Sequence, residues 1–568
     1  MMKIHRCALR ISTLLPAAVA VVLAACGDPS GPAEDNSLAP GQSKAVGGTT
    51  VTVEGGSTGS ENVLVLVDTA LTDSARTKVS YTVTVTGTGA AGAVSLPATA
   101  LVPSPQGPAL RAAGVTAPEL DISYGARLNA RDRTRLQRGF SAARAAYRAR
   151  STAAGGISRS LGVAPPQVGD IINFNVGTDD ACDDIVTRAG RVVAIGTQSI
   201  VVADTQNPSG GFTTADYQRF AARFDTLVYP LDVANFGAPG DVDANSKILL
   251  LFTSAVNELT PRNSESYVAG FFYNRDLFPT NNTPQFGPGC AGSNYSELFY
   301  LLAPDPTGLV NGNVRKTSFV DSVTTSVTAH EFEHLINASR RLYITQGVEE
   351  FEVGWLDEGL AHVAEELLFY RESGVSPKAN LDSIAIRSSD KIRFAFNNDQ
   401  SSNSSRYHDF LAAPSKNSPF RADDSLSTRG ATWNLLRYLA DRKGTSEAAT
   451  WLALVRGPSA GNANLKAVFG GDLSARVRDW SVSHYMDDLI SGLPAEFTQE
   501  SWNWHSLYKA IYKAPYPLEV KALTGGTASG ELIEGSSAYY RFSIPPNTSA
   551  TLTLSPGGPI AARVVRVR

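Results

Sequence analysis

A short run of ionisable residues inside an apolar segment, Thr328-Ala-His330-Glu331-Phe-Glu-His334-Leu-Ile, constrains this chain more than any other feature. In a helix, His330 and His334 stand one turn apart on one face, with Cβ atoms about 5–6 Å apart. Because unpaired histidine and glutamate side chains are costly in a buried helix, a metal ion or hydrogen bonds must satisfy them. The sequence therefore favours a metal site over a buried helix with two incidental histidines. The segment is apolar nearly all round, as in a central buried helix, through Phe319, Val320, Val323, Val327, Phe332, Leu335 and Ile336.

Zinc is the metal that suits these side chains best. Two imidazoles at this spacing can reach one ion at about 2.0–2.1 Å, the distance typical of zinc. Glu331 follows His330 directly, so it lies beside the ion, where its carboxylate can accept a proton from metal-bound water. The pattern thus predicts two zinc ligands and a general base on one helix.

The third ligand is expected from a second apolar helix, which starts near Gly354 and runs to about Tyr370. Glu358 in its first turns is the predicted ligand, and Asp357 is the competing candidate. Gly359, next to Glu358, leaves room for a close approach to the first helix. Two histidines, one glutamate and an open position for water form a catalytic rather than a closed structural zinc site. Less favoured as ligands are the acids of the connection, Glu349, Glu350 and Glu352.

Together, His330-Glu-Phe-Glu-His334-Leu-Ile-Asn-Ala-Ser-Arg340 and Trp355-Leu-Asp-Glu358-Gly-Leu-Ala resemble the motifs of the gluzincin zinc metallopeptidases, most of all the hyicolysin-type secreted bacterial peptidases. The resemblance covers about residues 166–501 and is strongest over 320–370. It implies an α+β fold with a thermolysin-like two-lobed zincin catalytic domain and endopeptidase activity. It also implies His330, His334 and Glu358 as zinc ligands and Glu331 as the base.

One position departs from that resemblance. Thermolysin-like enzymes have a His or Tyr that stabilises the oxyanion just before a Gly that opens a later helix, whereas here Arg429 precedes Gly430. The oxyanion donor is therefore unassigned, with Arg429 and Tyr343 as candidates beside Tyr407 and His408. His362, one turn after Glu358, is a candidate to support the ligands or face the substrate, and an ordinary structural histidine is the alternative.

The first 26 residues have the pattern of a bacterial lipoprotein signal peptide. A basic head with Lys3, Arg6 and Arg10 precedes an apolar core that is too short to span a bilayer comfortably. The core ends in Leu23-Ala-Ala-Cys26, which resembles a lipobox, and a Gly/Pro/Ser/Asp-rich tether follows over 27–48. We expect Cys26 to be lipidated, which would hold the protein to a membrane of the bacterial cell envelope outside the cytoplasm. An ordinary signal peptide with an incidental cysteine is the alternative.

Pattern changes along the 568 residues divide the chain into several parts. Both ends alternate apolar and polar residues with Gly-rich turns, which predicts small β-sandwich-like modules that flank the catalytic domain. An arginine-rich helical linker follows the first module, and its charges are expected to be solvated, although a basic cleavage site and a clamp on an acidic surface are alternatives. The expected boundaries are 49–118 for the first β module, 119–165 for the basic helical linker, 166–385 for an upper lobe with both zinc helices, 386–512 for a loop-rich segment and α-helical lower lobe, and 513–568 for the C-terminal β module.

Two further features bear on metal and redox chemistry. Cys182 and Cys290 are a candidate disulfide because the protein is expected to be exported, and two buried free thiols are the alternative. Asp241-Val-Asp243-Ala-Asn245 resembles the start of a calcium loop but lacks the later Gly and Glu, so a polar turn is favoured over Ca²⁺. The resemblance to gluzincins also implies an edge strand that binds substrate backbone, and one of the strands expected at 269–274 and 298–304 is the candidate.

These features lead to a zinc-dependent endopeptidase with protein or peptide substrates as the main hypothesis. A net charge of −4 gives no electrostatic reason to expect nucleic-acid binding. One alternative is a surface binding lipoprotein with a vestigial zinc site, but the intact Glu331 speaks against it. Another is a zinc aminopeptidase, but the chain has no Gly-x-Met-Glu-Asn segment to hold a substrate amine.

Overall fold

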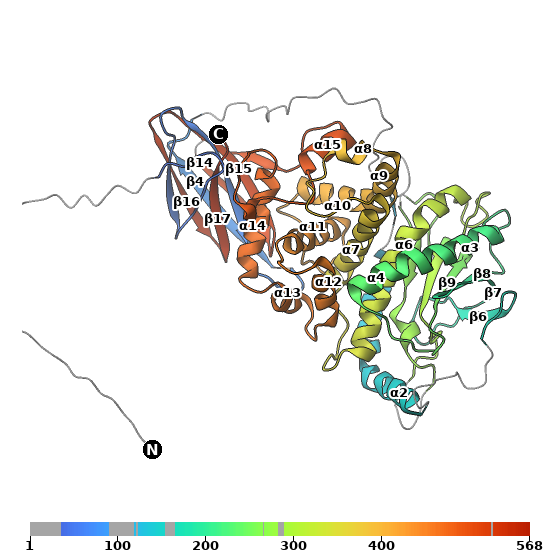
Figure 1. The fold of residues 1–568 in the computed structure, drawn as a ribbon. Helices are drawn as coiled ribbons and strands as arrows, with labels where there is room; N and C mark the ends of the chain where they lie inside the picture. Colours follow the sequence, from blue (N-terminus) through green and yellow to red (C-terminus); the bar gives the residue numbers. More distant parts are fainter. Residues whose placement is uncertain are drawn as a thin grey trace, which may run out of the picture. The chain divides into compact units, whose positions relative to one another are not determined.

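The computed structural model describes residues 36–75, 77–89, 119–120, 123–153, 165–264, 266–281, 289–523 and 526–568, and Ser37–Arg568 form one compact unit (Figure 1). The predicted signal peptide with Cys26 lies outside the described residues, as do residues 27–35 of the predicted tether and 90–118 of the first predicted β module. Among the described residues, no helix combines the length and the apolar character needed to span a bilayer. Helices and sheets both contribute, so the fold is α+β.

A six-stranded sheet with the strand order β11–β12–β9–β8–β7–β6 forms the first part of the molecule after the basic segment. The three central strands β12, β9 and β8 are parallel, and antiparallel strands flank them on both sides, so that β11 is an edge strand. Every residue of β9 and β12 is buried, in agreement with their unbroken apolar sequences. The strands are β6 (Ile171–Asn175), β7 (Thr187–Ile195), β8 (Ser199–Asp204), β9 (Ile248–Thr253), β11 (Gly270–Phe272) and β12 (Leu298–Leu302).

Helices pack on this sheet, with α3 against β7 and β8 and α6 against β11 and β12. The N-cap of α3 is Thr213, and its side chain and that of Asp216 form a capping box. Beside α3 (Thr214–Arg223) and α6 (Thr317–Ser339), this part contains η1 (Phe224–Val228), α4 (Tyr229–Phe236), α5 (Ser254–Glu258), η2 (Asn274–Leu277) and η3 (Arg340–Ile344).

The second part is helical and is organised around α7 (Gly354–Ser373), which packs on α6 and on α11 (Leu426–Asp441). A Cβ at Gly359 would lie 2.5 Å from Thr432 Cγ2, so this glycine makes room for α11 and not, as expected, for the first zinc helix. A Cβ at Gly430 would lie 2.3 Å from the carbonyl carbon of Arg406, so α10 and α11 touch through their backbones there. The other helices are α8 (Ser383–Arg387), α9 (Asp390–Ala395), η4 (Phe396–Gln400), α10 (Ser401–Ala412), α12 (Glu447–Arg456), α13 (Gly461–Phe469), α14 (Leu473–Met486), η5 (Ala495–Phe497) and α15 (Trp504–Tyr512).

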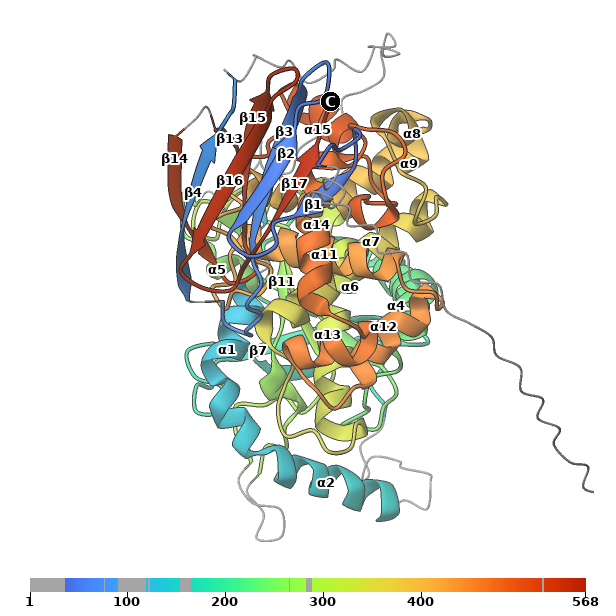
Figure 2. The same ribbon diagram turned by 90° about the vertical axis from the view of Figure 1, so that its left-hand side faces the viewer.

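One β-sandwich is built from both ends of the chain. Its sheets have the strand orders β1–β17–β3–β15–β13 and β14–β4–β16–β2, and Figure 2 shows the blue N-terminal strands interleaved with red C-terminal ones. The expectation of two separate β modules is therefore wrong, because β3 and β4 each pair with C-terminal strands on both sides. The strands are β1 (Ser43–Ala45), β2 (Thr50–Glu54), β3 (Ser60–Asp68), β4 (Lys78–Thr86), β13 (Val520–Ala522), β14 (Gly526–Ile533), β15 (Ser537–Ile544), β16 (Ser549–Pro556) and β17 (Ile560–Arg566).

The basic segment forms two helices, α1 (Ser123–Arg138) and α2 (Phe140–Ala153). The sequence favoured solvated arginines here, but several of them bind other parts of the chain. Arg133 Nη2 donates to the carbonyl of Phe351 at 2.6 Å, and Arg144 Nε donates to the carbonyl of Leu342 at 2.6 Å. The segment is thus clamped to the rest of the chain through backbone carbonyls as well as through acids. The acids are Asp180, Asp183, Glu349 and Glu350, and the carbonyl acceptors are not visible in a sequence.

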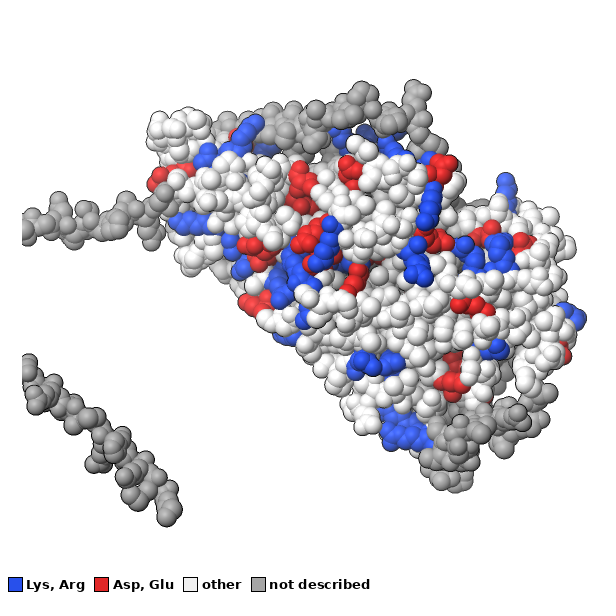
Figure 3. Space-filling model, in the orientation of Figure 1, with Lys and Arg blue, Asp and Glu red and all other residues white. Residues whose placement is uncertain are grey.

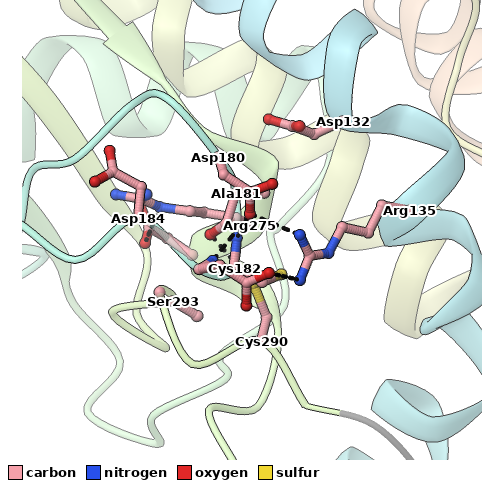
Figure 4. The surroundings of a disulfide bond; sticks show 12 residues. Asp132, Arg135, Asp180, Ala181, Cys182, Asp184, Arg275, Cys290 and Ser293 are labelled. Carbon is pink, nitrogen blue, oxygen red and sulfur yellow. Dashed lines mark hydrogen bonds and ion pairs between the residues drawn. A yellow bond between two sulfur atoms is a disulfide. The ribbon is translucent and has the colours of Figure 1, made fainter.

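A disulfide joins Cys182, between β6 and β7, to Cys290, which precedes β12 (Figure 4). Asp180 Oδ1 next to it accepts hydrogen bonds from Cys182 N at 2.9 Å and from Arg135 Nη1 at 2.6 Å. The disulfide therefore links the β6–β7 loop to the segment before β12, and Arg135 links the same loop to α1.

Candidate metal centre

The two histidines lie on α6, in its most buried stretch. His330 is fully buried and His334 is 7% exposed, and their Nε2 atoms approach to 3.2 Å. Upstream, Thr328 Oγ1 donates to the carbonyl of Thr324 at 2.6 Å, so this buried hydroxyl is satisfied within the helix. The spacing of four residues thus brings both imidazoles to one point, as predicted.

Glu358 reaches the same point from α7. Its Oε2 lies 3.5 Å from His330 Nε2, and its Oε1 lies 3.6 Å from His334 Nε2. A tetrahedral ion with bonds of about 2.0–2.1 Å has ligand atoms about 3.3–3.4 Å apart. The two Nε2 atoms lie 3.2 Å apart, and each has a different oxygen of Glu358 at 3.5 or 3.6 Å, so one zinc-sized ion fits between the imidazoles and this carboxylate.

Two acids of α7 contact the Nδ1 atoms of the imidazoles, on the side of each ring away from Glu358. Glu365 Oε1 lies 2.9 Å from His330 Nδ1, and Asp357 Oδ2 lies 3.0 Å from His334 Nδ1. Such contacts place the proton on Nδ1 and leave the Nε2 lone pair for a metal. Asp357, the competing ligand of the sequence analysis, thus has a different position, and Glu365 was missed. Its signal was its place two turns after Glu358 on the same helical face.

The charge balance of the cluster favours a cation. Burial opposes a charge on His330, but Glu358 and Glu365 outweigh it and raise the pKa of His330 to about 10. For His334, burial is outweighed by Asp357 and Glu358, and the pKa rises to about 9. The excess of carboxylates that holds these protons is the environment in which a dication can replace them.

Glu331 lies beside the cluster and contacts the edge strand β11. Its Oε2 accepts a hydrogen bond from Phe272 N at 2.8 Å, whereas its buried Oε1 has no hydrogen-bond partner among the described residues. Burial raises the pKa of Glu331. One carboxylate oxygen is thus fixed by the sheet, and the other is available for proton transfer.

Arg429 binds the ligand carboxylate from α11. Its Nη1 forms an ion pair with Glu358 Oε2, and its Nε and Nη2 donate to both oxygens of Asp424 at 2.7 and 2.8 Å. Burial disfavours the charge of Glu358, but Arg429 and the two imidazoles hold its pKa below the usual value. Arg429, a candidate oxyanion donor in the sequence analysis, therefore lies at the site, but in contact with Glu358, the third candidate ligand.

The other predicted site residues have different surroundings. His362 is fully buried, with Nδ1 3.3 Å from Glu365 Oε2, and its ring centroid lies 4.9 Å from that of His330. Burial lowers the pKa of His362 to about 3, so it is neutral. Tyr343 donates its hydroxyl to the carbonyl of Leu277 at 2.5 Å and stacks on Tyr147. His362 thus supports the carboxylate behind His330, whereas the hydroxyl of Tyr343 is directed to the backbone.

The calcium-like turn forms a separate group of acids. Asp241 and Asp243 lie with Glu297, which the sequence did not single out, and one ligand atom of each lies within 4.8 Å of the others.

No protein-family model matches the chain. Over 155 residues, 27% of this chain, it is 28% identical to neutral metalloprotease ShpI of Staphylococcus hyicus. The matched segment spans 31% of the length of that relative. Together with the buried His330–His334–Glu358 cluster, this partial similarity supports a metallopeptidase.

Proposed function

We propose that the protein is a zinc-dependent endopeptidase that hydrolyses peptide bonds of extracytoplasmic proteins. The observation that carries the proposal is the approach of His330 Nε2 and His334 Nε2 to 3.2 Å, with one oxygen of Glu358 3.5 Å from the first and the other oxygen 3.6 Å from the second. In this proposal His330, His334 and Glu358 hold one Zn²⁺, and a thermolysin-like two-lobed domain contains the sheet and α6 in one lobe and the helices after α9 in the other. Bound zinc supplies Lewis-acid polarisation of the scissile carbonyl and lowers the pKa of water.

Glu331 is the general base. Its Oε1 takes the proton of the attacking water and passes it to the leaving amine, while Phe272 N holds Oε2 in place. The raised pKa caused by burial makes this carboxylate a stronger base than an exposed glutamate. Glu365 and Asp357 keep the imidazoles oriented, and Arg429 with Asp424 does the same for Glu358.

A peptide substrate in extended conformation would pair with the edge strand β11. This strand lies beside the base, because Phe272 N in β11 donates a hydrogen bond to Glu331. The face shown in Figure 3 has Lys and Arg side chains interspersed with Asp and Glu and is mostly uncharged.

The location follows from the N-terminal sequence. We propose that Cys26 carries lipid and anchors the protein to a membrane of the bacterial envelope, facing outside the cytoplasm. The disulfide between Cys182 and Cys290 agrees with such an oxidising compartment.

Glu331→Gln tests the proposal. It should keep one zinc per chain and lower casein cleavage by about 10²–10⁴-fold, the usual contribution of a general base. The matched control is Glu349→Gln, an exposed acid between the zinc helices that pairs with Arg144 and should change neither zinc content nor cleavage. Undiminished cleavage by Glu331→Gln would refute the assignment. A zinc-free, inactive wild type would favour the binding lipoprotein, and cleavage restricted to free N-termini would favour the aminopeptidase.

A further inference from the structure

A second group of acids lies where two parallel strands begin. Asp241 and Asp243 belong to the loop before β9, and Glu297 immediately precedes β12. The strands pair in register, with Leu249 opposite Leu298, and Leu249 N donates to the carbonyl of Glu297 at 2.7 Å. This pairing brings the three carboxylates together, with one ligand atom of each within 4.8 Å of the others.

Glu297 is the side chain that points to a ligand. It is 1% exposed, and its Oε1 accepts a hydrogen bond from Val242 N at 2.6 Å. Its Oε2 and the Oδ1 of Asp241 are buried without a hydrogen-bond partner among the described residues. Lys247, the cation of the same loop, instead donates to the carbonyls of Gly196 and Thr197 at 2.6 and 2.8 Å. A buried acceptor that faces two more carboxylates requires a cation or a proton.

We propose that Asp241, Asp243 and Glu297 form a calcium site. The ligands are all oxygens, which hard cations prefer, and the group contains no imidazole or thiolate that would favour zinc. Asp241, Asp243 and Asn245 have the spacing of the first three ligand positions of a calcium loop. Glu297 takes the place of the acid that such a loop would supply later in sequence.

Calcium at this place would stabilise the end of the zinc helix as well as the sheet. It would link the loop before β9 to the start of β12. The same loop reaches α6, because Gly240 N donates to Ser339 Oγ at 3.0 Å. The site is independent of zinc, so it can be tested whether or not the protein is a peptidase.

The test uses the full chain, freed of metals on a chelating resin and reloaded with zinc alone. Calcium chloride at about 1 mM, the upper range for extracellular calcium modules, should bind at one ion per chain and raise the melting temperature by about 2 °C or more. Glu297→Gln and Asp241→Asn should each lose this binding while zinc content stays at one per chain. Asp321→Asn, an exposed acid paired with Arg219, is the control and should bind calcium like the wild type.

Absence of calcium binding by the folded wild type would overturn the proposal, and so would equal binding by both variants. Magnesium chloride at the same concentration should give no comparable shift, and an equal shift would overturn the assignment to calcium. Asp241 lies in a partly exposed loop, so Asp241→Asn provides the test if Glu297→Gln does not fold.

A different observation concerns α1, which covers the edge strand β11. Asn129 Nδ2 donates to the carbonyl of Phe272 at 3.2 Å, and Asn129 Oδ1 accepts from Asn274 N at 2.9 Å. A Cβ at Gly125 would lie only 3.1 Å from Phe271 Cβ and 3.2 Å from Phe272 O. The amide of Asn129 thus satisfies backbone groups that an added peptide strand would use.

The chain before α1 reaches the same region. β5 (Glu119–Leu120) pairs in parallel with β10 (Ser266–Tyr267), which precedes β11. Apolar residues anchor α1, with Leu128 5% and Leu136 2% exposed. Phe272 also binds Glu331, so the covered groups lie directly beside the base.

We infer that α1 occupies the peptide-binding edge and that the chain is autoinhibited until α1 moves. This inference rests on the proposed function. A helix over a sheet edge can also serve only to prevent aggregation, so its displacement must be measured through peptide binding.

Asn129→Leu removes both hydrogen bonds to the edge, and Gly125→Leu forces α1 away from Phe271. In a Glu331→Gln background, either change should tighten binding of an extended, fluorescent-labelled casein peptide at least about fivefold, because it raises the fraction of chains with an open edge. Thr134→Leu, on the exposed side of α1, is the control and should leave the affinity unchanged. In the active background, the same changes should raise kcat/KM.

Unchanged or weaker peptide binding by both variants, with zinc retained, would overturn the inference. If binding tightens but no form of the protein cleaves the peptide, the proposed function fails while the covered edge is upheld.

Discussion

Replacing Glu365 by glutamine should weaken zinc binding without touching a zinc ligand. Glu365 is 3% exposed, and its Oε1 lies 2.9 Å from His330 Nδ1. The substitution keeps the shape and an acceptor oxygen but removes the charge that strengthens the hydrogen bond and the basicity of the imidazole. The ring of His330 is then less firmly held, and its lone pair is a poorer ligand.

The structure also sets the size of the effect. Loss of such a carboxylate partner usually costs about 10–100-fold in metal affinity, or about 1.4–2.8 kcal/mol. Glu365 also contacts His362 Nδ1 at 3.3 Å, and it is fully desolvated, so we expect the upper half of this range. Asp357→Asn should have a smaller effect, about threefold to tenfold, because the side chain of Asp357 is 28% exposed and water can replace it.

The assay is competition for zinc with a chromogenic chelator, with the melting temperature measured in parallel. Glu366→Gln is the matched control, because Glu366 is the next residue on α7 and is equally buried, but it pairs with Arg437 and Trp502. It should lower stability and leave the zinc dissociation constant unchanged. Equal zinc affinity of folded Glu365→Gln and wild type would refute the reasoning, as would an equal loss in Glu366→Gln.

Three further predictions concern stability. Asp232 is fully buried without a hydrogen-bond partner among the described residues, and burial raises its pKa well above the usual value. The folded state thus keeps a proton that the unfolded chain releases. The free energy of unfolding therefore falls as the pH rises above the unfolded pKa, by up to about 1.4 kcal/mol per pH unit. Asp232→Asn removes this titration, so it should stabilise the protein more at pH 8 than at pH 5 in denaturant titrations. Replacing Cys182 and Cys290 by serine, which opens a link across 108 residues, should lower the free energy of unfolding by about 2–5 kcal/mol in the same titrations. Gly430→Ala should cost about 3 kcal/mol or more, because its Cβ meets backbone at 2.3 Å, whereas Gly444→Ala meets nothing within 4 Å and should stay within about 0.5 kcal/mol by thermal melting.

The clustering of the candidate metal ligands was predictable because its geometry is mostly local. His330 and His334 share a face of any helix, and Glu358 needs only that the next apolar helix packs on the first. Asp357 was predicted as a rival ligand because sequence gives the side of a helix but not the distance to a neighbour. In the structure it reaches the outer ring nitrogen of His334 at 3.0 Å instead.

Contacts over long sequence separations were not predictable. Arg429 was a candidate only because it precedes Gly430. Nothing in the sequence indicated that it binds both Glu358 and Asp424. The arginines of α1 and α2 were expected in solvent because charge runs usually are. Arg144 instead binds a carbonyl in η3, and Arg133 binds one in the connection to α7. Backbone acceptors cannot be recognised from a sequence.

The pairing of strands in the β-sandwich could not be predicted from the sequence pattern. Alternation identifies a strand with two different faces, but it does not identify what covers each face. In β3, Val63, Val65 and Val67 belong to the main core, whereas Leu64 and Leu66 belong to the core of the sandwich. Loss of β3 would therefore expose apolar surface in both cores at once and leave β15 and β17 without the strand between them. The N-terminal strands are thus part of the folded protein, whereas α1 belongs to no sheet and joins the main core through side chains such as Leu128 and Leu136.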